Sequence, residues 1–272
     1  MNDFMYNVIQ VSVIVPTYKP LGYLQECLDS IKNQAFRKDL YEVILVLNGE
    51  QEPYKSQIES YIHNNKDINI VFVYTSQSGV SNARNIALDI AKGKYITFID
   101  DDDYVSPSYL EELYLKASPE VVSLCYPLSF YDGDKQCFPY SITNEYIRSS
   151  TDDVCHFFKV RRFFNGPVYK LIHRDIIGER RFDPSFRNGE DSLFMFLISD
   201  RIDKVSFTSV NAVYYRRIRQ NSATTSKKSL KSVVTNVINL IISYTRIYIT
   251  AVRRYNMLFY VTRVLAALKS LK

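Results

Sequence analysis

The stretch GKYITFIDDDDY, from Gly93 to Tyr104, joins an apolar run to four consecutive acids. Tyr95 to Ile99 has the length and composition of a buried strand. The acids Asp100 to Asp103 follow directly, so they are expected at the carboxyl end of that strand. Adjacent carboxylates repel one another, and a fold tolerates them mainly where solvent or a cation compensates their charge. The stretch therefore predicts a cation site at a strand end, and the alternative is a solvated acidic turn.

Three apolar runs upstream alternate with segments of helical spacing. Val11–Val15, Tyr41–Leu47 and Ile70–Tyr74 are predicted strands, and Val80–Ala91 is a predicted helix with Gly93 at its C-terminal cap. Alternating elements of this length predict an α/β fold with a mostly parallel sheet flanked by helices. Ligands of such sheets bind beyond the carboxyl ends of the strands. The acids after Ile99 are therefore placed where a ligand is expected.

Length and composition fit one large α/β domain with an appendage. The chain has 272 residues, of which 46% are hydrophobic and 23% charged, which disfavours a disordered chain or a multi-span membrane protein. Four scattered cysteines without a CxxC pair indicate neither a zinc site nor a disulfide framework. The N-terminal sequence MNDFMYNVIQ lacks the features of a cleaved signal, so a cytoplasmic location is expected.

The second half of the chain has weaker periodicity. Val121–Cys125, Val205–Thr208 and Ala212–Tyr215 are predicted strands, and a helix is predicted to begin near Glu190. The segment Pro127–Thr151 is rich in Tyr, Asp, Pro and Ser and is predicted to be a loop or a variable insertion.

Several short motifs occur together in a specific order. They are VSVIVPTYK (Val11–Lys19), SGVSNARNIAL (Ser78–Leu88), GKYITFIDDDDY, NGEDSLF (Asn188–Phe194) and the later basic segment YYRRIRQNSATT (Tyr214–Thr225). In this order and spacing the chain resembles family 2 glycosyltransferases with the GT-A fold, over roughly its first four-fifths.

The resemblance implies a donor site at the ends of the first two strands. Pro16, Thr17 and Tyr18 would lie against the nucleoside of a nucleotide-sugar donor. Asn48 takes the place of an acid that often follows the second strand in this family. Asn offers both a donor and an acceptor where Asp only accepts, so the nucleotide base stays open, with a UDP-sugar favoured. The alternative for Asn48 is a turn residue before Gly49.

The resemblance also assigns roles around the acids. Arg84 matches the arginine of the family's ARN segment, which implies a polar contact near the nucleotide; the alternative is a solvated helix charge. Asp100 or Asp101 would lie near the ribose, and Asp102 is implied as the metal ligand. Carboxylate and diphosphate oxygens suit a hard divalent cation, Mn²⁺ or Mg²⁺.

A second pair of acids supplies the expected base. The acceptor hydroxyl needs a general base, because a neutral alcohol is a poor nucleophile at pH 7. Glu190 and Asp191 occupy the place of the family's ED motif, which implies Asp191 as the base of an inverting displacement and Glu190 as the group that orients the acceptor or the loop. The alternative is that both acids only favour the start of a helix.

A basic segment follows the predicted strand Ala212–Tyr215. Arg216, Arg217 and Arg219 resemble a segment that closes over the diphosphate in relatives, with Arg219 chosen as the donor contact; the arginine fork suits phosphate oxygens. The alternative is a solvated basic hairpin or a contact with lipid headgroups.

The C-terminal residues differ in charge from the rest. Asp203 is the last acid, so residues 1–226 are interpreted as the catalytic domain and 227–272 as a basic amphipathic helical tail. No run reaches about 18 uninterrupted apolar residues, so a spanning helix is not expected. Such a tail suits the surface of an anionic membrane, and the alternatives are packing on the catalytic domain or a homodimer through the tail helices.

Together these features predict an inverting transfer from a nucleotide-sugar to a hydroxyl of a glycan or lipid-linked saccharide, in surface polysaccharide biosynthesis. The rival hypotheses are a metal-dependent nucleotidyltransferase and a non-catalytic, membrane-associated protein that binds nucleotide-sugars. A dehydrogenase and a P-loop enzyme are disfavoured because neither GxGxxG nor GxxxxGK[ST] occurs in the expected place. A nucleic-acid partner is not expected.

Overall fold

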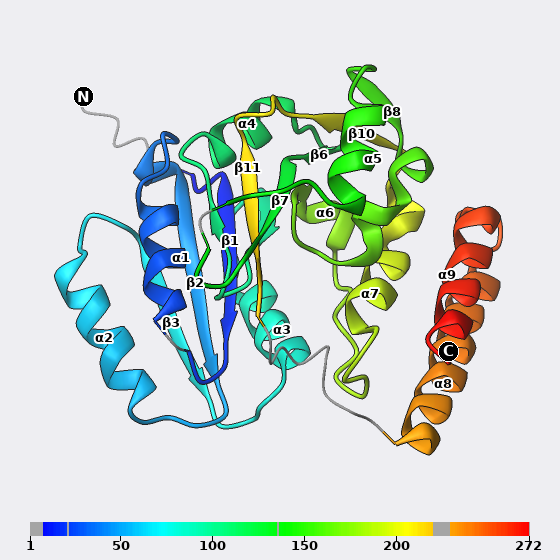
Figure 1. Cartoon of the computed structure of the whole chain (residues 1–272), viewed down its shortest axis with the longest axis horizontal. Coiled ribbons are helices and arrows are strands. Elements are labelled where there is room, and N and C mark those ends of the chain that lie inside the picture. Colours follow the sequence, from blue (N-terminus) through cyan, green and yellow to red (C-terminus); the bar gives the residue numbers. More distant parts are fainter. Residues whose placement is uncertain (1–7, 21, 135, 220–228, 272) are drawn as a thin grey trace, which may run out of the picture.

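The computed structural model describes residues 8–20, 22–134, 136–219 and 229–271. The chain folds around an eight-stranded sheet with the order β3-β2-β1-β4-β9-β6-β10-β8 (Figure 1). In that order the strands are Ile70–Thr75, Tyr41–Asn48, Val11–Thr17, Tyr95–Phe98, Lys170–His173, Val121–Leu124, Lys204–Phe207 and Val154–His156.

The first four strands of this order are parallel and form one half of the sheet. β1 pairs with β2 and with β4, and the register places Thr17 opposite Leu47. Their carboxyl ends therefore lie at one edge of the sheet. β9 runs antiparallel to both β4 and β6, so it joins this half to the other half. The predicted α/β class and the four N-terminal strands are confirmed.

Helices flank the sheet, and α3 packs on β1 and β2. The predicted helix 80–91 is confirmed as α3, but Gly93 is not its cap, because the helix ends at Ile90 with Ala91 as the C-cap. Gly93 is needed for a close approach instead, since a Cβ there would lie 2.4 Å from the Ser12 backbone nitrogen. The α-helices are α1 Tyr23–Lys32, α2 Tyr54–Asn64, α3 Val80–Ile90, α4 Tyr109–Lys116, α5 Ser141–Ser149, α6 Arg174–Ile177, α7 Glu190–Ile198, α8 Leu230–Thr250 and α9 Met257–Lys269, and the 3₁₀ helices are η1 Lys38–Leu40, η2 Phe157–Asn165 and η3 Ser199–Arg201.

A second, three-stranded sheet has the order β5-β11-β7, formed by Tyr104–Val105, Val213–Ile218 and Tyr126–Tyr131. The prediction of a loop over Pro127–Thr151 is wrong, because this segment contains most of β7 and all of α5. Proline disfavours a strand in sequence patterns, but among the described strands β7 pairs with β11 alone, apart from an isolated bridge from Ser129 to Phe138. It is therefore an edge strand, where proline is tolerated.

The C-terminal helices α8 and α9 form a hairpin at the end of the molecule opposite to α1 and α2, next to α7 (Figure 1). The side chains of Val237, Leu240 and Tyr244 on α8 and of Phe259 on α9 are buried. One face of the hairpin therefore packs on the preceding part of the chain. The expected boundary between residues 226 and 227 lies outside the described residues.

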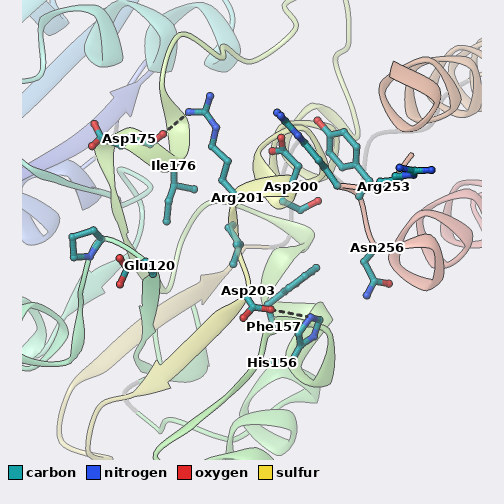
Figure 2. Close-up of a pocket in the computed structure, with 15 residues that line it drawn as sticks. Glu120, His156, Phe157, Asp175, Ile176, Asp200, Arg201, Asp203, Arg253 and Asn256 are labelled. Carbon is teal, nitrogen blue, oxygen red and sulfur yellow. Dashed lines mark hydrogen bonds and ion pairs between the residues drawn. The ribbon is translucent and has the colours of Figure 1, made fainter. Parts of the chain in front are cut away.

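A cavity of about 550 Å³ lies where the end of α7 meets the turn between α8 and α9 (Figure 2). Charged groups of both signs line it, among them Asp200, Arg201, Asp203 and Arg253. None of the predicted site residues lines this cavity. It is therefore separate from the edge of the sheet where the acids lie.

Candidate active site

The end of β1 is joined to the acidic run by a buried side chain. Thr17, only 1% exposed, donates a hydrogen bond of 2.5 Å from its hydroxyl to Asp101 Oδ2. Burial raises the pKa of the Asp101 carboxyl to about 7, and the Thr17 hydroxyl opposes this shift. Thr17, predicted to contact the nucleoside, and Asp101, predicted to lie near the ribose, are thus neighbours.

Asn48 uses both of its polar atoms to hold the edge of the sheet together. Its Nδ2 donates to the Thr17 carbonyl oxygen at 2.7 Å, and its Oδ1 accepts from the Gly79 backbone nitrogen at 2.8 Å. Gly79 is the N-cap of α3 and has a φ of +134°. A carboxylate could not donate to Thr17, so this bridge requires the amide that stands at position 48.

The two residues that flank Thr17 differ in exposure. Pro16 is buried within β1, whereas the Tyr18 side chain is 53% exposed. The ring of Tyr18 packs on Gly49, where a Cβ would lie 2.7 Å from Tyr18 Cε2. Tyr18 therefore presents an open aromatic face beside the end of β2.

Arg84 links the two distant groups of acids. It donates from Nη2 to Asp100 Oδ1 at 2.9 Å and from Nη1 to Asp191 Oδ1 at 2.5 Å. The Arg84 side chain is 3% exposed, so α3 holds a buried charge between the end of β4 and the start of α7. Carboxylates separated by 91 positions in the chain, at 100 and 191, are therefore brought into one cluster.

Asp191 lies in the first turn of α7, directly after Glu190. Burial raises the pKa of the Asp191 carboxyl, while the charge of Arg84 opposes the shift. Glu190 is close enough to Arg84 to help hold its guanidinium charged. The helix predicted near Glu190 is confirmed, and its first turn points acids at the cluster rather than at bulk solvent alone.

The other two acids of the run have partners on and beyond β11. Asp102 Oδ2 pairs with Arg219 Nη2 at 2.6 Å. Asp103 Oδ2 accepts from the Tyr214 hydroxyl at 2.8 Å, and its Oδ1 accepts from the Arg217 backbone nitrogen at 2.7 Å. The basic segment that follows Ala212–Tyr215 thus lies over the acidic run, and Asp103 fastens the two segments together.

Motif reasoning missed three features around Asp191. Lys170 on β9 is fully buried and donates to the carbonyl oxygens of Gly166 and Val168, both at 2.6 Å. Burial lowers the pKa of the Lys170 amine to about 7, and the charge of Asp191 opposes this. A Cβ on Gly166 would lie 3.8 Å from Asp191 Oδ2, and Tyr169 has a φ of +72°. A sharply turned loop, whose sequence matches no motif, therefore lies beside Asp191.

The acids offer oxygen ligands of the kind that a hard divalent cation prefers. Burial raises the pKa of the Asp102 carboxyl, and the charge of Asp100 adds to the shift, so a cation would relieve repulsion here. Within the described residues, no group of three or more His, Cys, Asp or Glu side chains is arranged to hold a metal ion. The carboxylate oxygens of the acidic run therefore fit a hard divalent cation in their chemistry.

Known proteins resemble the chain in sequence and in fold. GgaB, the minor teichoic acid biosynthesis protein of Bacillus subtilis (strain 168), is 30% identical over 228 residues, which cover 82% of this chain and 24% of GgaB. The chain thus spans about a quarter of that relative's length. The crystal structure of S. aureus TarS 1-349 in complex with UDP-GlcNAc superposes with a TM-score of 0.74 at 20% identity, over 96% of this chain and 72% of that chain.

A mannosyltransferase, PcManGT from Pyrobaculum calidifontis in complex with GDP-Man and Mn²⁺, superposes with a TM-score of 0.60 at 18% identity, over 96% of this chain and 69% of that chain. These likenesses show that the fold is of the GT-A type. The sequence model described as Glycosyl transferase family 2 matches residues 12–181, which is more than half of the chain. The chain therefore belongs to glycosyl transferase family 2.

Proposed function

We propose that the chain is an inverting glycosyltransferase that moves a sugar from a UDP-sugar to a hydroxyl of a glycan or lipid-linked saccharide. The contact that carries this proposal is the bridge from Arg84 to Asp100 and Asp191. It brings the acids expected at the donor together with the acid expected to act on the acceptor. A nucleotidyltransferase has no evident use for a second, distant carboxylate at this place.

Asp191 is the proposed general base. It accepts the proton of the acceptor hydroxyl while the acceptor oxygen bonds to the anomeric carbon of the sugar. The bond between that carbon and the diphosphate breaks in the same displacement, so the configuration inverts and nucleoside diphosphate leaves. The raised pKa of the Asp191 carboxyl makes it a stronger base than an exposed aspartate. Glu190 is proposed to orient the acceptor or the loop.

The donor is proposed to lie across the carboxyl ends of β1, β2 and β4. Tyr18 would stack on the base, and Pro16 and Thr17 would contact the nucleoside, with Asn48 holding this edge in shape. Asp100 and Asp101 would lie near the ribose. The UDP-GlcNAc bound to S. aureus TarS supports a uridine nucleotide.

Asp102 is the residue proposed to hold Mn²⁺ or Mg²⁺, together with the diphosphate. When bound, the cation supplies a Lewis acid that neutralises charge on the leaving diphosphate. Arg219, which pairs with Asp102, is proposed to contact the diphosphate when the donor is present, because its guanidinium fork suits phosphate oxygens. The Mn²⁺ in the PcManGT complex supports this choice of cation.

The acceptor is proposed to belong to a surface polysaccharide that is built at the cytoplasmic face of the membrane. The teichoic acid role in the name of GgaB supports this class of acceptor. The chain spans a minor part of that relative, so the comparison does not identify the sugar or the linkage. A screen of donors and acceptors identifies both.

The test is a donor screen with the purified full chain, Mn²⁺ and candidate acceptors, with detection of released nucleoside diphosphate and analysis of the product. We expect Asp191→Asn to lower kcat by about 10²-fold or more while donor binding persists. Asp102→Asn should abolish the Mn²⁺-dependent turnover while the fold stays intact. Asp89→Asn is the matched control, because Asp89 is an exposed acid on α3 that pairs with Arg181 away from the cluster.

Three results would contradict the proposal. An unchanged rate in Asp191→Asn would remove this residue as the base. Full activity of the unaltered chain in excess chelator would defeat the metal assignment. Release of sugar 1-phosphate, with the nucleoside monophosphate joined to the acceptor, would identify a nucleotidyltransferase instead.

A further inference from the structure

The outer face of the α8–α9 hairpin is apolar and open. On each helix the exposed apolar side chains recur at intervals of about one or two turns, so they form a stripe that runs along the helix beside the packed face. Their exposed fractions run from 37% at Val234 to 72% at Leu230. The stripe consists of Leu230, Val234, Ile238, Ile242 and Ile249 on α8 and of Met257, Val261, Leu265 and Leu268 on α9.

Basic residues accompany this outer face and acids do not. No acidic residue follows Asp203 in the sequence, whereas the described part of the hairpin carries exposed basic side chains along its length. The turn between the helices combines exposed Val252 with two arginines. The exposed basic residues are Lys231, Arg246, Arg253, Arg254 and Lys269.

The inner face of α8 is tied to the segment that leads into α7. The Tyr244 hydroxyl lies 2.7 Å from Ser192 Oγ, and Asn236 Nδ2 donates to the Asn188 carbonyl oxygen at 3.2 Å. Leu240 fills the space left by Gly189, where a Cβ would lie 2.7 Å from Leu240 Cδ1. α8 is therefore held on the same segment that presents Glu190 and Asp191.

These contacts bear on how α8 could meet a membrane. By length and composition α8 could cross a bilayer, with a mean hydropathy of 1.2. However, a spanning α8 would have to leave the polar contacts at Ser192 and Asn188 and place Arg246 within the helix in hydrocarbon. The packed arrangement leaves only one face of the helix for lipid, which suits a helix that lies in the interface.

We propose that the outer face of the α8–α9 hairpin docks on the surface of an anionic lipid bilayer. The apolar stripe enters the headgroup region, and the basic side chains beside it contact lipid phosphates. The basic charge of this face disfavours a second copy of the chain as its binding partner. A two-fold interface through this face would place the same unbalanced basic residues opposite one another.

Docking of this kind also favours one class of acceptor, a saccharide anchored in the same bilayer. If the proposed sugar transfer is correct, the segment that carries Asp191 lies on the bilayer side of the catalytic domain, because α8 holds that segment with one face and lipid with the other. An acceptor anchored in the same bilayer would reach the base without leaving the membrane. Docking itself can be measured without donor or acceptor, so it can fail independently of sugar transfer.

The experiment is flotation of the full chain with vesicles of phosphatidylglycerol and cardiolipin, compared with vesicles of phosphatidylcholine. Ile238→Asp and Leu265→Asp each place an acid in the stripe. Leu115→Asp is the matched control, because Leu115 is 74% exposed on α4, outside the hairpin. We expect the unaltered chain and the control to float with anionic vesicles, and each stripe variant to bind about tenfold more weakly. High salt should reduce binding.

Other outcomes would overturn the proposal. Recovery of the unaltered chain wholly in the soluble fraction with anionic vesicles would refute docking without any variant. Equal flotation of Ile238→Asp and Leu115→Asp would place the contact elsewhere. A dimer in light scattering that Leu265→Asp dissociates, without vesicle binding, would assign the face to a second copy. Resistance to alkaline carbonate extraction would identify a spanning helix.

Discussion

Gly189 should be the position where a single methyl group disturbs both the hairpin and the catalytic loop. Its φ of +87° is left-handed, which costs alanine about 1 kcal/mol. The new Cβ would also lie 2.7 Å from Leu240 Cδ1 and 3.1 Å from Cδ2, and overpacking of this kind costs about 1–3 kcal/mol. Gly189→Ala should therefore lower the free energy of unfolding by about 2–4 kcal/mol.

A double-mutant cycle separates these two contributions. Leu240→Ala removes the side chain that the new Cβ meets, so in that background Gly189→Ala should cost only the backbone term of about 1 kcal/mol. Urea unfolding of the four proteins measures the free energies, and nucleoside diphosphate release reports on the loop. The same cost of Gly189→Ala in both backgrounds would refute the proposed contact between α8 and the loop.

Three further predictions concern the acid cluster. Arg84→Gln should lower the free energy of unfolding by about 3–5 kcal/mol, because it leaves Asp100 and Asp191 without their shared buried cation; a loss below about 1 kcal/mol in urea would contradict this. Asn48→Asp should lower the free energy of unfolding by about 1–3 kcal/mol, since a carboxylate cannot donate to the Thr17 carbonyl oxygen. A melting temperature equal to that of the unaltered chain would contradict a stabilising role for this hydrogen bond. Burial raises the pKa of Asp191, which acts unprotonated, so kcat/KM should fall as the pH drops through a value above the usual 3.8, and Arg84→Gln should move this fall to still higher pH.

The sequence predicted best where periodicity and chain order agreed. The strands up to Phe98 and the helix α3 follow from continuous apolar runs that alternate with segments of helical spacing, and short connections leave few other topologies for them. β7 and α5 were missed for local reasons. Pro127 disfavours a strand prediction for β7, because proline is tolerated only at an edge position. The N-cap of α5 is Tyr140, which is not one of the common capping residues.

At the candidate site, the sequence predicted which residues belong to the site but not which residues they contact. The motifs single out Arg84 and Asp191, yet their 2.5 Å contact depends on how α3 and α7 pack, which no local pattern encodes. Lys170 gave no signal at all, because an isolated lysine in GPVYKL resembles any solvated charge. Its complete burial follows from its place on β9, between β4 and β6.

The four aspartates at 100–103 look alike in the sequence, but each has a different neighbour: Arg84, Thr17, Arg219 and the pair of Tyr214 and the Arg217 backbone. The run is therefore not a redundant store of negative charge. Replication slippage that deleted one aspartate codon would still leave three acids. However, it would shorten by one residue the connection between β4 and β5, so three acids would remain for four sets of partners and β5 would be displaced relative to β4. Such a short deletion should be far more harmful than its modest change in composition suggests.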